Sequence, residues 1–270
     1  MVSEGLTQFL FEIASDERLG ILQATGRRPL RHAEIARTLG MTGSETTRHL
    51  NRLAEAGLVS KNPRGQYEPT LLAEALLTGL PFLVFLTAHR RYLLDHRLAA
   101  LPTAFVERIG ELAQGAFVGG TYRVVALQEA ALRAVARRIW VVTEQRFEAA
   151  IPIFRAKVQA GADVRIVRSR PHLEEEKRAG LDVPRNFPVK SLPTVDLFLA
   201  VLDDQAGLCL PGPDGHADLG TMILLTDAEG VRWAEDLFRL LWERADPWRI
   251  PLAPSTARDG SSRRVTGPGG

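Results

Sequence analysis

The stretch that decides the fold of the first part of the chain is GMTGSETTRHLNRLAEAGLVSKNPRGQYEP, from Gly40 to Pro69. Thr42 is followed three residues later by Glu45, which is the spacing at which two side chains cap the first backbone N–H groups of a helix. The helix that follows has one face that is predicted to point inward, made by Thr46, Leu50, Leu53 and Ala54. The pattern therefore predicts an amphipathic helix that begins after Thr42.

The opposite face of this helix is polar, and its residues are Ser44, Thr47, Arg48, Asn51 and Glu55. Arginine can pair with two acceptors on guanine, and asparagine can pair with adenine. The first turns of a recognition helix lie closest to the base edges. Candidate contacts to bases or phosphates are therefore Thr42, Ser44, Glu45, Thr47, Arg48, Asn51 and Arg52, the last of them on a phosphate. An amphipathic helix in a small helical domain would show the same periodicity.

The residues after this helix favour a DNA-reading helix over an amphipathic helix in a small helical domain. Ala56 to Val59 ends the helix and begins a strand, Lys61 to Gly65 forms a tight basic turn, and Gln66 to Glu68 returns as a second strand. Such a strand pair is a wing, with Lys61 and Arg64 placed at its tip to contact phosphates or the minor groove.

Two helices are expected before Gly40. Ser15 is placed to cap a helix that ends at Gly26, and a second helix follows Pro29. Ile35, Ala36 and Leu39 share one face of this second helix, and Gly40 supplies the left-handed residue at which such a helix stops.

The segment GMTGSETTRHLNRLAEAGLV resembles the recognition-helix region of bacterial and archaeal ArsR-type and MarR-type repressors. The resemblance implies a winged helix-turn-helix over residues 1–78 and double-stranded DNA as partner. Metal sensors of the ArsR type add cysteine or histidine ligands, whereas the chain has only Cys209, far from this segment. Metal sensing is not implied, and Cys209 is expected to be a buried apolar residue.

Charge is concentrated in this first part of the chain. Between Arg18 and Arg64 there are nine basic residues and three acidic ones, so the net charge of this segment is +6. Since the net charge of the whole chain is +2, the net charge of the remaining residues is −4. A basic module on a mildly acidic body is typical of a phosphate-binding domain carried by a second domain. No cofactor is expected. The longest apolar run, Ala75 to Ala88, is expected to be too short for a membrane span, and the absence of a signal pattern predicts a cytoplasmic location.

Helices are expected over residues 70–77, at the end of the first domain, and over residues 82–94, within a connector that spans residues 79–118. The apolar face of the second helix is broad, which favours a homodimer, because two copies match a two-fold symmetric DNA site. The alternative is a helix that packs between the two domains of one chain. His89 and His96 are expected to be surface or interface residues rather than metal ligands.

An α/β domain is predicted over residues 119–250, so the fold class of the whole chain is α/β plus α+β. Strands are expected at residues 139–142, 164–167, 195–202, 207–210 and 221–225, with a helix over 147–160 between the first two, which makes them parallel. The sheet is therefore mixed, and a last helix capped by Thr226 and Glu229 covers it. Residues 251–270 are expected to be disordered.

An effector pocket is expected at the carboxyl ends of the parallel strands, which brings together Thr143, Glu144, Gln145, Arg168 and Ser169. Solvated loop positions are the alternative interpretation of these polar residues. Asp203, Asp204, Asp214 and Asp218 are interpreted as turn residues rather than as a cation site.

Three further segments, LPTAFVERIGELAQGAFV, DLFLAVLDDQAGLCLPGPDGHADLGTMILLTD and WAEDLFRLLW, resemble an archaeal regulator family that joins a winged helix to a methanogenesis-regulatory domain. The resemblance implies a transcriptional regulator whose second domain is like half of a phospholipase-D fold and senses a small molecule or a protein. Catalysis in that fold requires a His-x-Lys pair. His172 and His216 are followed by other residues, so no enzyme activity is expected. The alternatives from other classes are a winged-helix module for protein contacts and a degenerate hydrolase.

Overall fold

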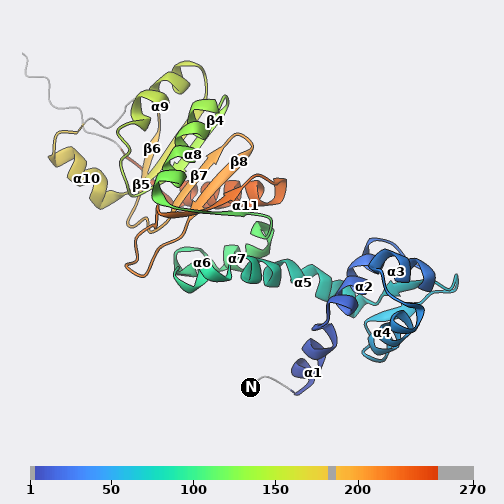
Figure 1. Cartoon of the computed structure of the whole chain (residues 1–270). Coiled ribbons are helices and arrows are strands. Elements are labelled where there is room, and N and C mark those ends of the chain that lie inside the picture. The colour runs from blue at the N-terminus through green and yellow to red at the C-terminus, as the bar shows by residue number, and fades with distance from the viewer. Residues whose placement is uncertain (1–3, 182–186, 249–270) are drawn as a thin grey trace, which may run out of the picture.

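The computed structural model describes residues 4–181 and 187–248. It has a helical N-terminal domain with a two-stranded wing and a C-terminal α/β domain, joined by a long helix that gives the molecule an elongated shape (Figure 1). This architecture confirms the predicted fold class. The prediction for residues 251–270 lies outside the described residues.

The N-terminal domain packs its helices around a core of Ile21, Leu22, Ile35, Leu50, Leu53 and Leu58. Its elements are α1 (Glu4–Ile13), α2 (Asp16–Arg27), α3 (His32–Leu39), α4 (Gly43–Glu55), β1 (Val59–Lys61) and β2 (Tyr67–Pro69). The caps at Ser15 and Thr42 are confirmed, and Gly40 ends α3 with a left-handed φ of 63°. Helix α1 was not predicted. The inward position of Ala54 was wrong, since Ala54 is exposed and His49 is buried on that side.

Helix α5 (Leu71–Ala88) is continuous where two helices were expected, and Pro81 lies inside it. Proline removes one backbone donor and normally breaks a helix. Helix α5 nevertheless continues through Pro81, and it packs against the 3₁₀ helix η2 (Ile109–Leu112). A Cβ at Gly110 would lie 2.5 Å from the backbone nitrogen of Phe82, so only glycine allows the two segments to approach so closely. Tertiary packing outweighs the local signal here.

Helix α5 is also long and apolar enough, by length and composition, to cross a membrane, with a mean hydropathy of 1.9 over 18 residues and 17% of the segment buried. The expectation that the segment is too short was therefore wrong. The helix crosses the boundary that we predicted at residue 78 and contacts folded elements of both domains, namely α2 and β2 on one side and η2 on the other. These contacts are those of a connector between two domains.

Of the two histidines that follow α5, His89 is buried and His96 is partly buried, so the interface alternative of their predicted positions is the one that fits. His89 is 3% exposed, and neither of its ring nitrogens meets hydrogen-bond geometry with a described residue. His96 stacks on Tyr92, and its Nε2 lies 3.1 Å from Oδ2 of Asp218. The contact with Asp218 ties His96 of the connector to the α/β domain.

Burial lowers the pKa of His89 below the usual 6.5, because a charged imidazole would lose its hydration. The unfolded chain therefore takes up a proton at this residue before the folded protein does. Stability is fully present above pH 6.5 and is lost as the pH falls toward the lowered folded pKa. We expect wild type to lose up to about 1.4 kcal/mol more than His89→Phe between pH 7.5 and pH 5.5, in paired urea melts. Equal losses in the two proteins would contradict this.

The described residues of the α/β domain form one mixed sheet of eight strands in the order β10-β6-β5-β4-β7-β8-β9-β3. Strands β4, β5 and β6 are parallel, and every other neighbouring pair is antiparallel. The strands are β3 (Ala116–Gly119), β4 (Arg138–Val142), β5 (Asp163–Ser169), β6 (Val189–Leu192), β7 (Phe198–Leu202), β8 (Gln205–Cys209), β9 (Thr221–Leu225) and β10 (Asp246–Pro247). The predicted parallel pair and the mixed sheet are confirmed.

Helices cover both faces of this sheet, as Figure 1 shows. The helices of the domain and connector are α6 (Arg90–Leu94), α7 (Thr103–Glu107), α8 (Thr121–Ala134), α9 (Ala150–Gln159), α10 (Arg170–Arg178) and α11 (Ala228–Arg244), with the 3₁₀ helix η1 at Leu98–Ala100. Trp140 and Val142 of β4 pack in the cluster with α11, whereas Ile139 and Val141 pack in the cluster with α8 and α9. Strand β4 is apolar throughout because both faces are covered.

Several elements of this domain were not predicted: β3, α8, α10, β6 and β10. The cap of α11 was also wrong, because Asp227 accepts from the backbone nitrogens of Glu229 and Gly230 in place of Thr226. The aspartates expected in turns are confirmed in that role at Asp203, which accepts three backbone N–H groups from residues 136–138. Cys209 is fully buried, and burial raises the pKa of its thiol.

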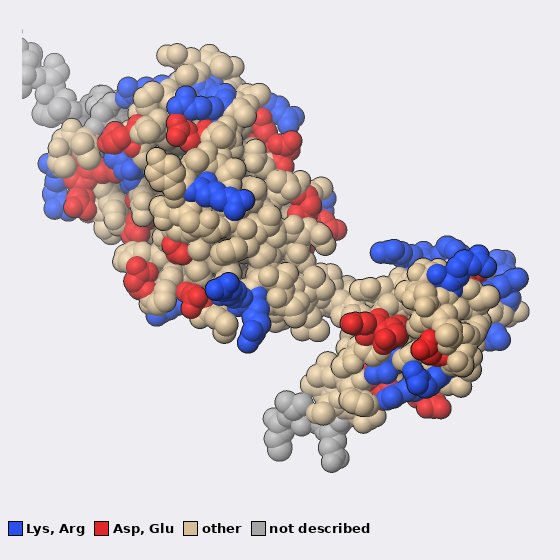
Figure 2. Space-filling view, in the orientation of Figure 1, with Lys and Arg blue, Asp and Glu red and all other residues tan. Residues whose placement is uncertain are grey.

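Lysine and arginine side chains gather over the N-terminal domain in the view of Figure 2, whereas the α/β domain shows both signs of charge interspersed. This distribution agrees with the basic segment between Arg18 and Arg64.

Candidate nucleic-acid interface and ligand pocket

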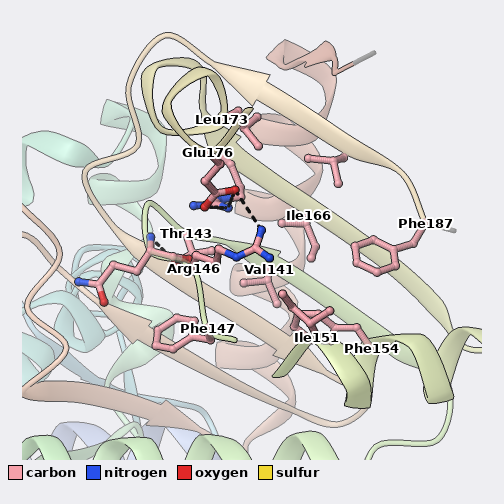
Figure 3. A pocket seen from close by; sticks show the side chains of 13 residues that line it. Val141, Thr143, Arg146, Phe147, Ile151, Phe154, Ile166, Leu173, Glu176 and Phe187 are labelled. Carbon is pink, nitrogen blue, oxygen red and sulfur yellow. Dashed lines mark hydrogen bonds and ion pairs between the residues drawn. The ribbon is translucent and has the colours of Figure 1, made fainter. Parts of the chain in front are cut away.

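The polar residues expected at the carboxyl ends of the parallel strands do meet there. Thr143 and Gln145 follow β4, Arg168 is the last residue but one of β5, and all three line one cavity of about 60 Å³, which we call the middle chamber. The remaining lining residues are Val141, Arg146, Phe147, Ile151, Phe154, Ile166, Leu173, Glu176, Phe187 and Val189 (Figure 3). Ser169 is placed differently, because it is buried and bonded to His172 at 2.7 Å.

A buried ion pair forms the polar wall of the middle chamber. Nη1 of Arg168 lies 2.7 and 2.8 Å from the two carboxylate oxygens of Glu176, and its Nη2 donates to the carbonyl of Glu144 at 2.8 Å. Arg168 and Glu176 are 8% and 7% exposed. Nε of Arg168 is buried without a hydrogen-bond partner among the described residues. Arg146 also reaches Glu176, at 3.4 Å, as the dashed line in Figure 3 shows.

A larger, open chamber of about 520 Å³ adjoins this wall and shares Gln145, Arg146, Arg168 and Glu176 with the middle chamber. We call it the outer chamber. Glu144 lines it and accepts from Nδ1 of His216 at 3.1 Å, with Nδ1 of His172 3.5 Å from its other oxygen. The carboxylate of Glu144 raises the pKa of His216. No group of three or more potential metal ligands was found among residues 4–181 and 187–248.

The predicted DNA-reading face of α4 is exposed. Ser44, Thr47, Arg48 and Asn51 all point away from the domain core, while Thr46, Leu50 and Leu53 are buried beneath them. The hydroxyl of Thr47 lies 3.0 Å from Nε2 of His32 on α3, which fixes the two helices at this end.

The wing is ordered by one asparagine side chain. Oδ1 of Asn62 accepts from the backbone nitrogens of Arg64 and Gln66, at 3.0 and 3.1 Å. The turn therefore holds the exposed side chains of Lys61 and Arg64 at its tip, and Nζ of Lys61 lies 5.6 Å from the ring centre of Tyr67. Strands β1 and β2 pair antiparallel from Val59↔Pro69 to Lys61↔Tyr67.

A family model described as a helix-turn-helix domain matches residues 13–61. The chain contains a helix-turn-helix domain. The match covers α2, α3, α4 and β1, and its last residue is Lys61 at the base of the wing turn. It includes the exposed face of α4 but not the return strand β2.

Comparison of the whole structure gives weaker similarities. The archaeal chromatin protein TrmBL2 is similar over 90% of this chain and 99% of its own, with 15% identity and a TM-score of 0.40. Two phospholipase D family structures are each similar over 50% of this chain. Nuc from Salmonella typhimurium matches over 99% of its own length, with 11% identity and a TM-score of 0.37. NucT from Helicobacter pylori matches over 98% of its own length, with 12% identity and a TM-score of 0.40. No curated protein matches the sequence. Similarities at this level are too low to assign a function.

Some basic residues of the helix-turn-helix domain are engaged inside the protein. Nε and Nη2 of Arg52 donate to the carboxylate of Glu12 on α1 at 3.1 and 2.8 Å, and the contact of Arg52 with a phosphate stays a prediction. Arg18 is buried and donates to the backbone carbonyl groups of Phe11 and Glu12 at the end of α1. Thr42 and Glu45 are occupied by capping. The free basic groups are therefore fewer than the charge count indicates.

Sequence reasoning missed the residues that complete the pocket. Arg146, His172, Glu176 and His216 line the middle or outer chamber and were not among the predicted site residues. Arg146 follows the predicted Gln145 directly and was within reach of the same strand-end argument. Glu176 lies on α10, an element with no apolar run to reveal it, so no local signal pointed to it.

Proposed function

We propose that this protein is a sequence-specific DNA-binding transcriptional regulator. The observation that carries the proposal is the exposed face of α4 with Arg48 and Asn51, beside a wing that holds Lys61 and Arg64. Arg48 pairs with guanine and Asn51 with adenine, while the wing residues contact phosphates or the minor groove. The protein acts in the cytoplasm and belongs with the archaeal regulators that its separated motifs resemble.

The α/β domain serves as a sensor and not as an enzyme. Its pocket lies at the carboxyl ends of β4 and β5, where ligands bind in open α/β sheets. The His-x-Lys pair of the phospholipase D chemistry does not occur in the sequence, so the domain lacks the nucleophile and phosphate ligand of that reaction. Ligand binding changes the geometry of the two domains about α5.

The active form is a homodimer built through α5 and α1. The exposed apolar side chains of these helices are Leu6, Leu10, Phe11, Leu71, Leu72, Leu83 and Val84. A two-fold axis along α5 would cover this surface and place two recognition helices on adjacent turns of DNA.

The double substitution Leu83→Glu with Val84→Glu is expected to raise the dimer dissociation constant about 100-fold, because it places four carboxylates in one two-fold apolar interface. Sedimentation equilibrium measures this dissociation constant. Tyr122→Glu, at a 93% exposed position on α8, is the control and is expected to leave the constant unchanged. A monomeric wild type at micromolar concentration would contradict the dimer.

Selection from a random duplex library tests the function itself. Wild type is expected to enrich a two-fold symmetric site whose half-sites lie about 10 base pairs apart, centre to centre. Arg48→Ala is expected to relax selection at one guanine in each half-site. Failure to enrich any sequence would indicate that the helix-turn-helix domain contacts protein rather than DNA.

A further inference from the structure

We propose that the α/β domain binds a neutral, largely apolar molecule of the size of a single ring. The molecule lies between α8, α9 and the sheet, and its polar group meets the side-chain amide of Gln128. The proposal names the ligand class of the sensor domain, and only its regulatory consequence rests on the proposed function.

The site is a cavity of about 110 Å³ between α8, α9 and the sheet, which we call the apolar chamber. Its lining includes large apolar side chains from three elements, namely Val125 and Leu132 of α8, Ile153 of α9, and Phe198 and Leu202 of β7. Gln128 and Glu129 are the two lining residues with polar side chains. Such a cavity stays dry, because a water molecule inside it would find few hydrogen-bond partners. A hydrocarbon or aromatic group can therefore fill it without displacing bound water.

Small residues leave this space open and set its size. Ala150 on α9 and Ala200 on β7 line the apolar chamber. Ala200 also lines a second cavity of about 40 Å³ under α8, together with Gly207 of β8, and Gln128 lines both cavities. An apolar cavity of about 150 Å³ holds one benzene molecule. The apolar chamber with its smaller neighbour therefore suits a ligand with one ring.

The rim of the two cavities is apolar. Val125 lines the apolar chamber and Leu127 lines the smaller cavity, and both side chains are exposed on α8. They lie between the solvent and the interior. An apolar rim allows an apolar molecule to enter beside α8, and the bound ligand would cover part of this exposed surface.

The charged groups on the other side of the chamber are already paired, which favours a neutral ligand. Phe147 lines both the apolar chamber and the middle chamber, and in Figure 3 it lies below Arg146. The guanidinium groups of Arg146 and Arg168 both contact the carboxylate of Glu176, and Arg146 also contacts Glu148. A charged ligand would have to displace one of these ion pairs, whereas a neutral ligand leaves them intact.

The polar edge of the chamber on α8 offers a neutral amide. Glu129 is engaged, since its Oε1 accepts from Nη2 of Arg133 at 2.6 Å. Nε2 of Gln128 donates to Sδ of Met222 at 3.6 Å, and a thioether sulfur is a weak acceptor. A hydroxyl or carbonyl group on the ligand would give this amide a stronger partner. The edge therefore favours a neutral molecule that carries one such group.

Isothermal titration calorimetry on the full chain at pH 7, without DNA, tests the proposal. The probes share one ethylphenyl group: ethylbenzene and 4-ethylphenol are neutral, 4-ethylbenzoate is an anion and 4-ethylbenzylamine is a cation. We expect 4-ethylphenol to bind with a dissociation constant below about 1 mM, ethylbenzene about 5-fold more weakly, and each charged probe at least about 10-fold more weakly. Because DNA is absent, failure of the proposed DNA binding leaves this result intact, and failure here leaves DNA binding intact.

Three variants test the place of the ligand. Ala150→Phe fills the apolar chamber and is expected to weaken both neutral probes at least about 10-fold. Gln128→Leu removes the amide, so it is expected to weaken 4-ethylphenol about 5-fold and to leave ethylbenzene unchanged. Ala126→Phe is the matched control, because it adds the same ring at an exposed position of α8 outside both cavities, and it is expected to change nothing.

Three results would overturn the proposal. The first is that neither neutral probe binds the folded wild type, and the second is that a charged probe binds as tightly as 4-ethylphenol. The third is wild-type affinity for 4-ethylphenol in either Ala150→Phe or Gln128→Leu. Gln128 is partly exposed, so Gln128→Leu keeps this third test available if Ala150→Phe does not fold.

Discussion

Glu176→Leu is expected to lower the free energy of unfolding by about 3–5 kcal/mol, the largest effect of a single substitution that we predict. Glu176 is the only carboxylate that contacts the buried guanidinium of Arg168 among the described residues, and it also faces Arg146. Leucine would fill the space but leave a positive charge with a carbonyl group as its remaining partner. A buried charge without its counter-charge loses hydration without recovering it.

Urea unfolding followed by circular dichroism measures this loss. Glu175→Leu is the matched control, since Glu175 is the exposed neighbour on the same helix, and its effect is expected to stay within about 0.5 kcal/mol. Arg168→Met together with Glu176→Leu is expected to recover most of the stability, because both charges are then removed. A loss below about 1 kcal/mol for Glu176→Leu alone would show that the pair is hydrated.

Arg48→Ala is expected to weaken binding to the selected DNA site by about 1–3 kcal/mol for each half-site, and to leave binding to unrelated DNA nearly unchanged. Arg48 is exposed in the second turn of α4, and its Nη2 lies 3.5 Å from Nε2 of His49, which is the limit of a hydrogen bond. Its guanidinium group is therefore available to guanine. A bidentate pair is lost when the side chain is truncated, while the phosphate contacts of the wing remain.

Fluorescence anisotropy with the selected duplex and a scrambled duplex measures sequence-specific binding and non-specific binding separately. Arg37→Ala on α3 is the control, because Arg37 is exposed and lies outside the predicted reading face. Equal weakening on both duplexes by Arg48→Ala would assign this residue to the phosphates rather than to a base.

The sequence predicted the helix-turn-helix domain well because its signals are local. Thr42 and Glu45 cap a helix through bonds to their own neighbours, and Gly40 adopts a conformation that its own lack of a side chain permits. The ion pair of Arg52 is the opposite case, because it joins residues that are far apart in the sequence. Its partner Glu12 lies 40 residues earlier on helix α1, which the sequence pattern did not predict.

The connector shows how packing overrides a local signal. Pro81 predicts a break between two helices, but the close approach of Gly110 to Phe82 accompanies one continuous helix. Fusion of the two helices also gives an 18-residue apolar segment that neither predicted piece had. Such a result depends on a contact between residues some 30 positions apart, which periodicity does not report.

The sequence predicted the strand-end residues of the pocket but not the residues that its helices contribute. Parallel β4 and β5 bring their carboxyl ends to one edge, so Thr143, Gln145 and Arg168 were expected together and are found together. Their chemistry depends on Glu176 and on the apolar chamber, which require α10 and α8 to be placed first. Both helices have mixed polar sequences and were not predicted.

The measurement that tests the central claim most directly is the affinity of wild type for its own upstream DNA across a salt series. The account predicts tight binding whose logarithm falls linearly with the logarithm of salt concentration, with a slope that Arg64→Ala reduces by about 1 in magnitude for each protomer. Binding no tighter than to random DNA at every salt concentration, with the same slope for wild type and Arg64→Ala, would contradict it.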